Sequence, residues 1–210
     1  MKITDLSHII NNDITVFNDA EKPEINISST HKRDGYAQKK LCMYSHNSTH
    51  VDAPFHIIPG ANTLDELSPD TFYGKALIAD CRKTGKKIEI SHLEKYAGRL
   101  NDADFIILHT GWYKKWNTPD YKRNFPVLTE EAAEWLLQFH LKGIGLDTIS
   151  IDPIDSTDLP VHRIILGNNL IIIENLNNLE SLPEDDFTFS CFPLRIEDAD
   201  GSPTRAIGIM

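Results

Sequence analysis

The chain is poor in the features that mark secreted, membrane-bound and nucleic-acid-binding proteins. Only three of its 210 residues are cysteine, Cys42, Cys81 and Cys191, and none forms a CxxC pair, so we expect reduced thiols in a cytoplasmic protein. No stretch reaches the roughly 18 apolar residues of a membrane helix, and the N-terminus lacks the apolar run of a signal peptide. Basic residues number 21 against 31 acidic ones, and the net charge of −10 repels phosphate backbones. We therefore expect no membrane and no nucleic acid as a partner.

What the chain does contain is a set of short apolar runs rich in isoleucine, and these predict a sheet. They cover residues 75–81, 104–111, 143–151 and 169–176. Their near-continuous apolar character is typical of strands that are covered on both faces. No repeat or linker interrupts the sequence, and a chain of this length suits one domain. We predict a single α/β domain over residues 1–210 with a mixed, strand-rich sheet.

Two segments have the capping pattern of helices. Residues 91–98 begin at Ser91 and end at a glycine, and residues 129–142 begin at Thr129 with acidic residues in the first turn and end before Gly143. Residues 117–126 predict a loop. At the C-terminal end, a turn at Asp200-Gly201 followed by a final strand is expected.

The stretch SHNSTHVDAPFH, residues 45–56, concentrates three histidines and an aspartate in twelve positions. A helix is unfavourable there, because Asn, Ser, Thr and Val are poor helix formers and Pro54 interrupts a helix. In a strand, alternate side chains share a face, which would place four even-numbered residues together and direct Val51 into the core. These four are His46, Ser48, His50 and Asp52.

Pro54 has no N–H for a strand ladder, so we expect the chain to bend after Asp52 and to bring His56 back on a separate path. Three imidazoles and a carboxylate can then converge on one point. This donor set suits zinc, manganese or iron. The alternative, a solvated polar strand face, does not account for four potential ligands on one face, so we interpret the cluster as a metal site.

A second source of ligands is expected, because one strand alone holds a metal loosely. Residues 160–176 offer His162 and Glu174, the latter at the end of a run of three isoleucines. A carboxylate that ends a buried run needs a partner. The same segment is also compatible with a strand that simply emerges into solvent at Glu174, and the residues alone leave both interpretations open.

These residues match a known signature. The pattern His46-x-x-x-His50-x-Asp52-x-Pro54-x-His56 resembles the His-x-Gly-Thr-His-x-Asp-x-Pro-x-His signature of the cyclase-type metal-dependent hydrolases, which include bacterial kynurenine formamidases and isatin hydrolases. The resemblance extends over most of the chain. Further similar segments are LHTGW at 108–112, DTISIDP at 147–153, the His162 and Glu174 pair, and DADGSPTRAI at 198–207.

The resemblance implies a swivelling β/β/α fold, a homodimer or larger assembly, and a small-molecule amide as substrate. By resemblance, the metal ligands are His46, His50, Asp52, His162 and Glu174. Asp52 and Glu174 would be able to bridge two ions, and His56 would be the general acid and base. Isatin hydrolases resemble the chain less at the position of Glu174. They carry an amide side chain there, and they bind a single manganese ion. Glu174 therefore favours the formamidase branch, with one or two zinc ions, or manganese, as cofactor.

The implied reaction is hydrolysis of an aryl formamide, N-formyl-L-kynurenine to L-kynurenine and formate, by metal-activated water. Two positions depart from the family pattern: Ser48 stands in place of glycine, and Phe17 stands where formamidases carry a tryptophan. We expect both side chains to line the substrate site. The alternatives are a hydrolase of a different cyclic or acyl amide, such as isatin, and a binding protein without turnover, which only Ser48 favours.

The remaining polar residues have ordinary explanations. We expect His8 and His31 at the surface, His140 packed or half-exposed on the apolar face of its helix, His92 at a helix start and His109 in the core. Asp147 and Asp152 are expected to cap or turn the chain after a strand. The partners of Arg195 and Arg205, a substrate carboxylate or a second subunit, stay open.

Overall fold

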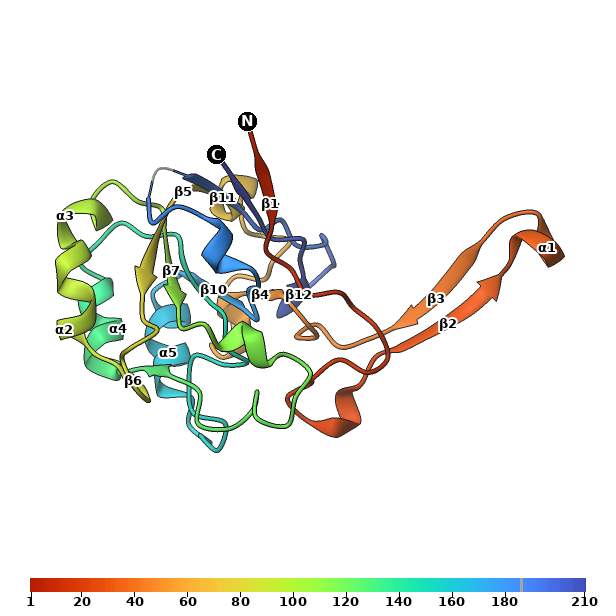
Figure 1. The fold of residues 1–210 in the computed structure, drawn as a ribbon, viewed down its shortest axis with the longest axis horizontal. Helices are drawn as coiled ribbons and strands as arrows, with labels where there is room; N and C mark the ends of the chain where they lie inside the picture. The colour runs from red at the N-terminus through yellow and green to blue at the C-terminus, as the bar shows by residue number, and fades with distance from the viewer. Residues whose placement is uncertain (186) are drawn as a thin grey trace.

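The isoleucine-rich runs build the centre of a nine-stranded sheet in the computed structural model, which describes residues 1–185 and 187–210. In spatial order the strands are β1 (Ile3–Asp5), β13 (Ile207–Ile209), β11 (Phe187–Ser190), β5 (Tyr73–Asp80), β7 (Phe105–His109), β9 (Gly143–Leu146), β10 (Ile171–Glu174), β4 (His50–Asp52) and β12 (Gly201–Pro203). The central strands β5, β7, β9 and β10 are parallel, and the outer pairs are antiparallel. The sheet is therefore mixed, and the two chain ends lie side by side on β1 and β13 (Figure 1).

Helices lie on one side of the central strands (Figure 1). They are α2 (Ile90–Leu93), α3 (Ala97–Leu100), α4 (Glu130–Leu136) and α5 (Pro160–Gly167). Strand residues alternate between two apolar clusters: Ile106 packs with the helices, whereas Ile107 packs in the opposite cluster. Burial on both faces explains why these strands read as continuous apolar runs.

Two small ribbons lie outside the main sheet. The strands β6 (Lys87–Ile88) and β8 (Val127–Leu128) pair in parallel. The strands β2 (Glu24–Ser29) and β3 (Gln38–Cys42) form a long hairpin with α1 (His31–Asp34) at its tip. Figure 1 shows this hairpin leaving the body of the protein altogether.

The predicted α/β class and strand-rich sheet are confirmed, and β5, β7, β9 and β10 lie within or beside the four predicted strands. The β9 strand ends at Leu146, well before the predicted limit at 151. Beyond its end the chain continues as a loop, in which the carbonyl of Thr148 accepts a hydrogen bond from the backbone N–H of Asn175. The sheet draws strands from both ends of the chain, which agrees with one domain over residues 1–210, although that organisation stays a prediction.

The first predicted helix is divided into short successive pieces, and the second is shorter than expected. Residues 90–100 form α2, a 3-10 turn and α3 in succession. The helix expected over 129–142 ends at Leu136, where 3-10 bonds from Leu137 and Gln138 tighten the last turn. This early end lets the chain turn so that Leu141 reaches the core. Propensity favoured a longer helix, and tertiary packing overrode it.

In the tail, the expected final strand is present as β13, but the expected turn is not. Gly201 does not form a turn with Asp200; it begins β12, which pairs with β4. Of the helices in the described part of the chain, none has the length and apolar character needed to cross a membrane.

Candidate metal centre

Sheet register brings the carboxylate of Glu174 to the strand that carries the histidine signature. The β10 and β4 strands pair antiparallel with Glu174 directly opposite His50. Alternation then places His50, Asp52 and Glu174 on the helix-covered face, whereas Val51 packs in the opposite cluster as predicted. All three polar residues are buried. Of the two interpretations of Glu174, emergence into solvent is therefore wrong.

Helix α5 supplies His162 from above this face. Pro160 occupies its first turn, where a missing N–H costs nothing. The Asp152 carboxylate accepts hydrogen bonds from the backbone N–H groups of Val161 and His162, at 3.1 and 2.9 Å. It also lies 2.7 Å from the His162 ring Nδ1. Asp152 thus caps helix α5, in agreement with its expected capping role. Its contact with Nδ1 also directs the His162 Nε2 toward the carboxylates of Asp52 and Glu174.

His46 reaches the same point through a turn rather than through strand alternation. The β4 strand begins only at His50, and Ser48 has a left-handed backbone with φ of 63°. This conformation favours glycine, which is the residue of the family signature at this position. The Ser48 hydroxyl is buried and donates to the carbonyl of His8 at 3.3 Å. The expectation that its side chain shares the metal-facing side is wrong, because the turn points it away, and Ser48 is not among the residues that line the cavity.

The polar atoms converge closely around Asp52. One oxygen, Oδ1, lies 2.7 Å from His46 Nδ1 and 3.1 Å from His50 Nε2. The other, Oδ2, lies 3.9 Å from His162 Nε2. Glu174 lies 3.5 Å from the same His162 nitrogen and 3.7 Å from His50 Nε2. The five residues expected as ligands are therefore brought together at one place.

These contacts set the charge of the site. Burial by itself lowers the pKa of His46, but hydrogen bonds to Asp200 and Asp52 and the charges of both carboxylates raise it to about 10. Burial likewise opposes protonation of His162, and Asp152, Glu174 and Asp52 together raise its pKa to about 10. Burial would raise the pKa of Asp52, but the charges of His50 and His46 hold it well below its ordinary value. Without an ion, protons on histidine thus balance the carboxylates.

The donor set fits a divalent metal. Three groups of residues have donor atoms within 4.8 Å of one another, and one of them is His46, His56 and Asp200. The other two are His46, His50 and Asp52, and Asp52, His162 and Glu174. They share Asp52, whose buried Oδ2 has no hydrogen-bond partner in the structure. A buried carboxylate oxygen without a partner is costly unless an ion or proton occupies it. Imidazole and carboxylate ligands in this arrangement suit zinc or manganese.

Asp200 belongs to this site, and sequence reasoning gave it no role. Its Oδ2 lies 2.9 Å from His46 Nε2 and 3.7 Å from His56 Nδ1. Hydrogen bonds from His46 and His56 lower the pKa of Asp200 far below its ordinary range. It lies beside β4 because β12 pairs with that strand. The DADG segment drew notice only by resemblance, and no spacing within it indicated a site.

Gly201, the next residue, makes room for the His46 ring. A Cβ placed on Gly201 would lie 2.6 Å from His46 Cε1 and 3.0 Å from the carbonyl oxygen of Val51. The close approach of β12 therefore requires glycine. His56, in the 3-10 turn Pro54–His56, returns over the site after the predicted bend, and its ring centroid lies 4.0 Å from that of His46.

The histidines and carboxylates form the floor of a cavity of about 250 Å³. Its rim comes from the N-terminal segment and from the loops after β9 and before α5. The rim residues are Thr15, Val16, Phe17, Glu21, Ile149 and Leu159. Phe17 thus lies where the sequence placed it, with 46% of its surface exposed. No Lys or Arg of the described chain lines the cavity. A metal cation would therefore fit as the positive charge that balances the carboxylates of Asp52 and Glu174.

Other residues noted in the sequence lie elsewhere. His31 is exposed as expected, and His92 accepts from the Glu89 N–H at a helix start. His140 is also exposed, whereas a packed or half-exposed ring was expected. The expectation of a near-surface His8 is wrong, because its ring is buried in a stack on Trp116 at 4.1 Å. His109 is buried in the core as predicted.

Of the two arginines whose partners were left open, Arg205 forms a bidentate pair with Asp5 on its own chain. Arg195 lies beside a second groove, which includes Leu64 and Phe72.

Comparison with known proteins places the chain in a family. The model of the Cyclase family matches residues 4–153, so the chain belongs to that family. The prediction made from the histidine signature is confirmed, and with it the prediction that the chain is an enzyme of the hydrolase class.

Particular relatives and structures agree. The chain is 30% identical over 207 residues to a protein of Bacillus thuringiensis strain Al Hakam named kynurenine formamidase, covering 97% of this chain and 95% of the relative. A kynurenine formamidase of Bacillus anthracis is 30% identical over 210 residues, with 98% and 96% covered. Among solved structures, isatin hydrolase A from Labrenzia aggregata superposes with a TM-score of 0.88 at 22% identity, covering 100% of this chain and 93% of that one. At 22% identity, this structural similarity is evidence for the fold alone.

Proposed function

We propose that this chain is a metal-dependent hydrolase of an aryl formamide, with N-formyl-L-kynurenine as substrate and L-kynurenine and formate as products. One observation carries the proposal: two donor groups share Asp52 on the floor of a cavity that Phe17 borders. The relatives named kynurenine formamidase, at 30% identity over nearly the whole chain, support the substrate.

His46, His50, Asp52, His162 and Glu174 would hold one or two metal ions, because Asp52 is common to two of the donor groups. We propose zinc, with manganese as the alternative. A divalent ion supplies Lewis-acid chemistry, lowering the pKa of a water to roughly 7 and polarising a carbonyl. Glu174 supports the formamidase branch, because the resemblance associates an amide at this position with isatin hydrolases.

The chain's own residues would then handle the proton and the substrate. His56 stands over the donor groups with Asp200 near its Nδ1, so it is placed to take a proton from water and return it to the leaving amine. An aryl amine is a better leaving group than an alkyl amine, which suits this transfer. Phe17 would stack on the aryl ring of the substrate.

We further propose that the enzyme acts in the cytoplasm as a homodimer or larger homo-oligomer, on a small-molecule amide. The three cysteines are free thiols, with Cys81 and Cys191 buried, which agrees with a reducing compartment. The family resemblance supports the assembly.

The test is release of kynurenine from N-formyl-L-kynurenine by purified protein, with and without added zinc or manganese and with a chelator. We expect metal-dependent release that the chelator abolishes. No release with metal shown to be bound would refute the formamidase proposal, and isatin would be the next substrate, because isatin hydrolases share the fold.

The role of His56 is tested separately. The His56→Ala variant should keep its metal content and lose most turnover, whereas His140→Ala, an exposed histidine at a distance, should change neither. Loss of metal together with activity would show that His56 is a ligand rather than the acid and base.

A further inference from the structure

One carboxylate at the rim of the metal cavity has no part in the proposed reaction. Glu21 ends the 3-10 helix η1 (Asp19–Glu21), is half-buried, and lines the cavity on the same segment as Phe17. The other two carboxylates that line the cavity, Asp52 and Glu174, belong to the metal donor groups. Glu21 is therefore a negative charge at the entrance that the donor groups do not include.

Local hydrogen bonds hold Glu21 in place. Its Oε2 accepts from the Asn18 N–H at 3.4 Å, and the Asn18 side chain accepts from the Ala20 N–H, which together form the cap of η1. The carbonyl of Glu21 accepts from the side chain of Asn47 at 3.1 Å. Asn47 is buried and directly follows the donor residue His46. The rim carboxylate thus has a fixed position relative to the floor of the cavity.

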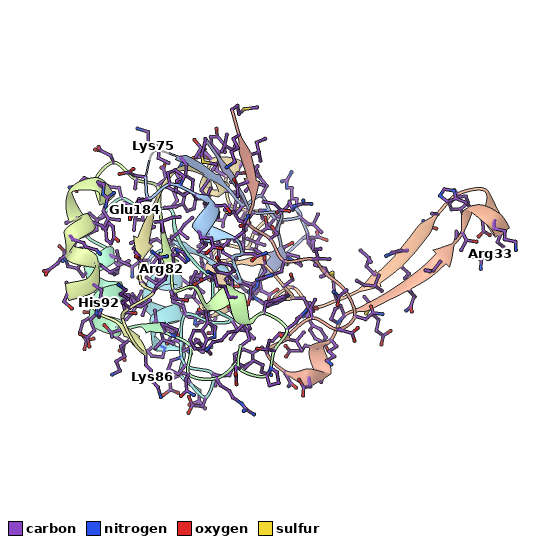
Figure 2. The ribbon with its side chains drawn as sticks, viewed as in Figure 1. Arg33, Lys75, Arg82, Lys86, His92 and Glu184 are labelled. Carbon is purple, nitrogen blue, oxygen red and sulfur yellow. The ribbon has the colours of Figure 1, made fainter. Side chains whose placement is uncertain are left out.

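Within the described part of the chain, no lysine or arginine neutralises Glu21. The next residue, Lys22, is exposed and does not line the cavity, and Lys122 lies 3.9 Å from Asp19 instead. Figure 2 shows Arg33 at the far tip of the β2–β3 hairpin that follows. None of the ion pairs formed by the described lysines and arginines includes Glu21. Because a charge at a cavity wall is screened less than one in bulk water, Glu21 attracts a cation that enters.

The chemistry of that cation follows from the rest of the cavity. Under the proposed function, the floor takes the formamide and Phe17 takes the aryl ring, so the other substituent of the ring extends along the rim segment that ends at Glu21. An ammonium group on this substituent would donate a charge-assisted hydrogen bond to the carboxylate. An uncharged group would gain no such bond, and a carboxylate would be repelled.

We propose that Glu21 binds the ammonium group of the aryl formamide substrate, and that the enzyme thereby selects substrates with a cationic side chain over uncharged ones. In N-formyl-L-kynurenine the ammonium would point to Glu21 and the neighbouring carboxylate to the water at the cavity mouth. The inference rests on the proposed function for the reaction. The recognition itself is a separate claim, because binding of an ammonium can be measured without turnover.

The test compares two matched substrates and two matched variants. One substrate is the aryl formamide of kynuramine, whose side chain ends in an ammonium and has no carboxylate, and the other is its isostere with a methyl group in place of the ammonium. Glu21→Gln removes the charge and keeps an oxygen to accept from the Asn18 N–H. Asp19→Asn makes the same change of charge in the same 3-10 helix, at an exposed residue outside the cavity lining. Circular dichroism and thermal unfolding check that both variants are folded.

We expect Glu21→Gln to raise KM about fivefold for the kynuramine formamide and for N-formyl-L-kynurenine, a value between those of an exposed ion pair and a buried charged hydrogen bond. Its kcat should stay unchanged, because the bond is equally strong in the ground state and the transition state. The KM of the uncharged isostere should stay unchanged, and so should every value for Asp19→Asn. Equal effects on the charged and uncharged substrates, or no effect on either, would overturn the proposal.

A binding measurement separates this proposal from the proposed function. If the metal-loaded wild type hydrolyses none of these formamides, the proposed function fails, and titration calorimetry with kynuramine, the amine product, still tests the recognition. We expect Glu21→Gln to bind kynuramine about fivefold more weakly than the wild type and Asp19→Asn do. Equal affinity of all three proteins for kynuramine would show that Glu21 does not bind the ammonium.

Discussion

Asp152 holds both the backbone and the ring of His162 with one carboxylate oxygen. Its Oδ2 lies 2.9 Å from the His162 backbone nitrogen and 2.7 Å from the ring Nδ1. The contact fixes the tautomer, because a proton on Nδ1 leaves Nε2 free as a ligand. Asp152, whose carboxylate accepts from the first-turn N–H groups of helix α5, thereby orients a metal donor on that turn.

The Asp152→Asn variant should bind zinc 10- to 100-fold more weakly, in the range typical when the outer partner of a ligating histidine is replaced. The helix cap largely survives, since the asparagine oxygen still accepts from the backbone. Isothermal titration with zinc measures the effect. The matched control is Asp155→Asn, an exposed aspartate in the same loop, and equal affinity in the two variants would show that Asp152 has only a capping role.

Asn175 orients a second donor histidine, His50, through a chain of hydrogen bonds. Its side chain accepts from the Tyr121 hydroxyl at 2.9 Å and donates to the Ser48 carbonyl at 2.9 Å. That carbonyl lies 2.9 Å from His50 Nδ1 and so fixes the second histidine.

We expect Asn175→Gly to weaken zinc binding about tenfold, because it removes these bonds while glycine tolerates the left-handed backbone, φ of 56°. Asn178→Gly is the control: Asn178 has the same φ but bonds to the carbonyl of Asp5. The absorption spectrum of the cobalt-substituted protein should change only for Asn175→Gly. A spectrum that changes equally in both variants would contradict the connection to His50.

Ser48 adopts a backbone that a side chain disfavours. Both Ser48→Gly and Ser48→Ala lose the hydroxyl bond to His8, but only glycine relieves the left-handed conformation, worth about 1 kcal/mol. We expect the glycine variant to be more stable than the alanine variant by about that amount in urea unfolding. Equal stability, or a more stable alanine variant, would show that the turn is not strained.

Asp147 gives the protein a pH-dependent stability. Burial raises its pKa from 3.8 to about 6, although Thr110 bonds its Oδ1 and opposes the shift. The folded state therefore holds this proton more tightly than the unfolded state, and the free energy of unfolding falls as pH rises from about 4 to about 6.

The Asp147→Asn variant does not titrate there. The free energy of unfolding of the variant, relative to that of the wild type, should increase by roughly 3 kcal/mol from pH 4 to pH 7. This figure is the wild-type shift from 3.8 to about 6 at about 1.4 kcal/mol for each pKa unit. Urea unfolding of both proteins at a series of pH values measures the difference. A difference that does not change with pH would mean that the wild-type carboxyl has the same pKa when folded and unfolded.

Several features of the site could be predicted from local sequence. Poor helix formers and Pro54 exclude a helix, and they set the extended backbone of His50–Asp52 and the bend that brings His56 back. Three isoleucines before Glu174 indicated a buried strand, whereas the residues alone left open whether the carboxylate at its end has a partner or emerges into solvent. These are short-range properties of backbone preference and burial, which a sequence records directly.

Other features could not be predicted, because they depend on pairs of segments far apart in the chain. Ser48 was expected on the metal-facing side, but a left-handed turn points its hydroxyl to His8. Asp200 had no role until β12 paired with β4 and placed it 2.9 Å from His46. Helix 129–142 was expected to be longer, since propensity says nothing of the turn that buries Leu141.

The sequence by itself determined the kinds of donor atoms, the strands that carry most of them and the family. Only the tertiary structure decided which atoms meet. Sheet register set Glu174 against His50, and the cap of α5 aimed His162 at both carboxylates. Register and capping across loops are long-range relationships, and no local pattern of residues encodes them.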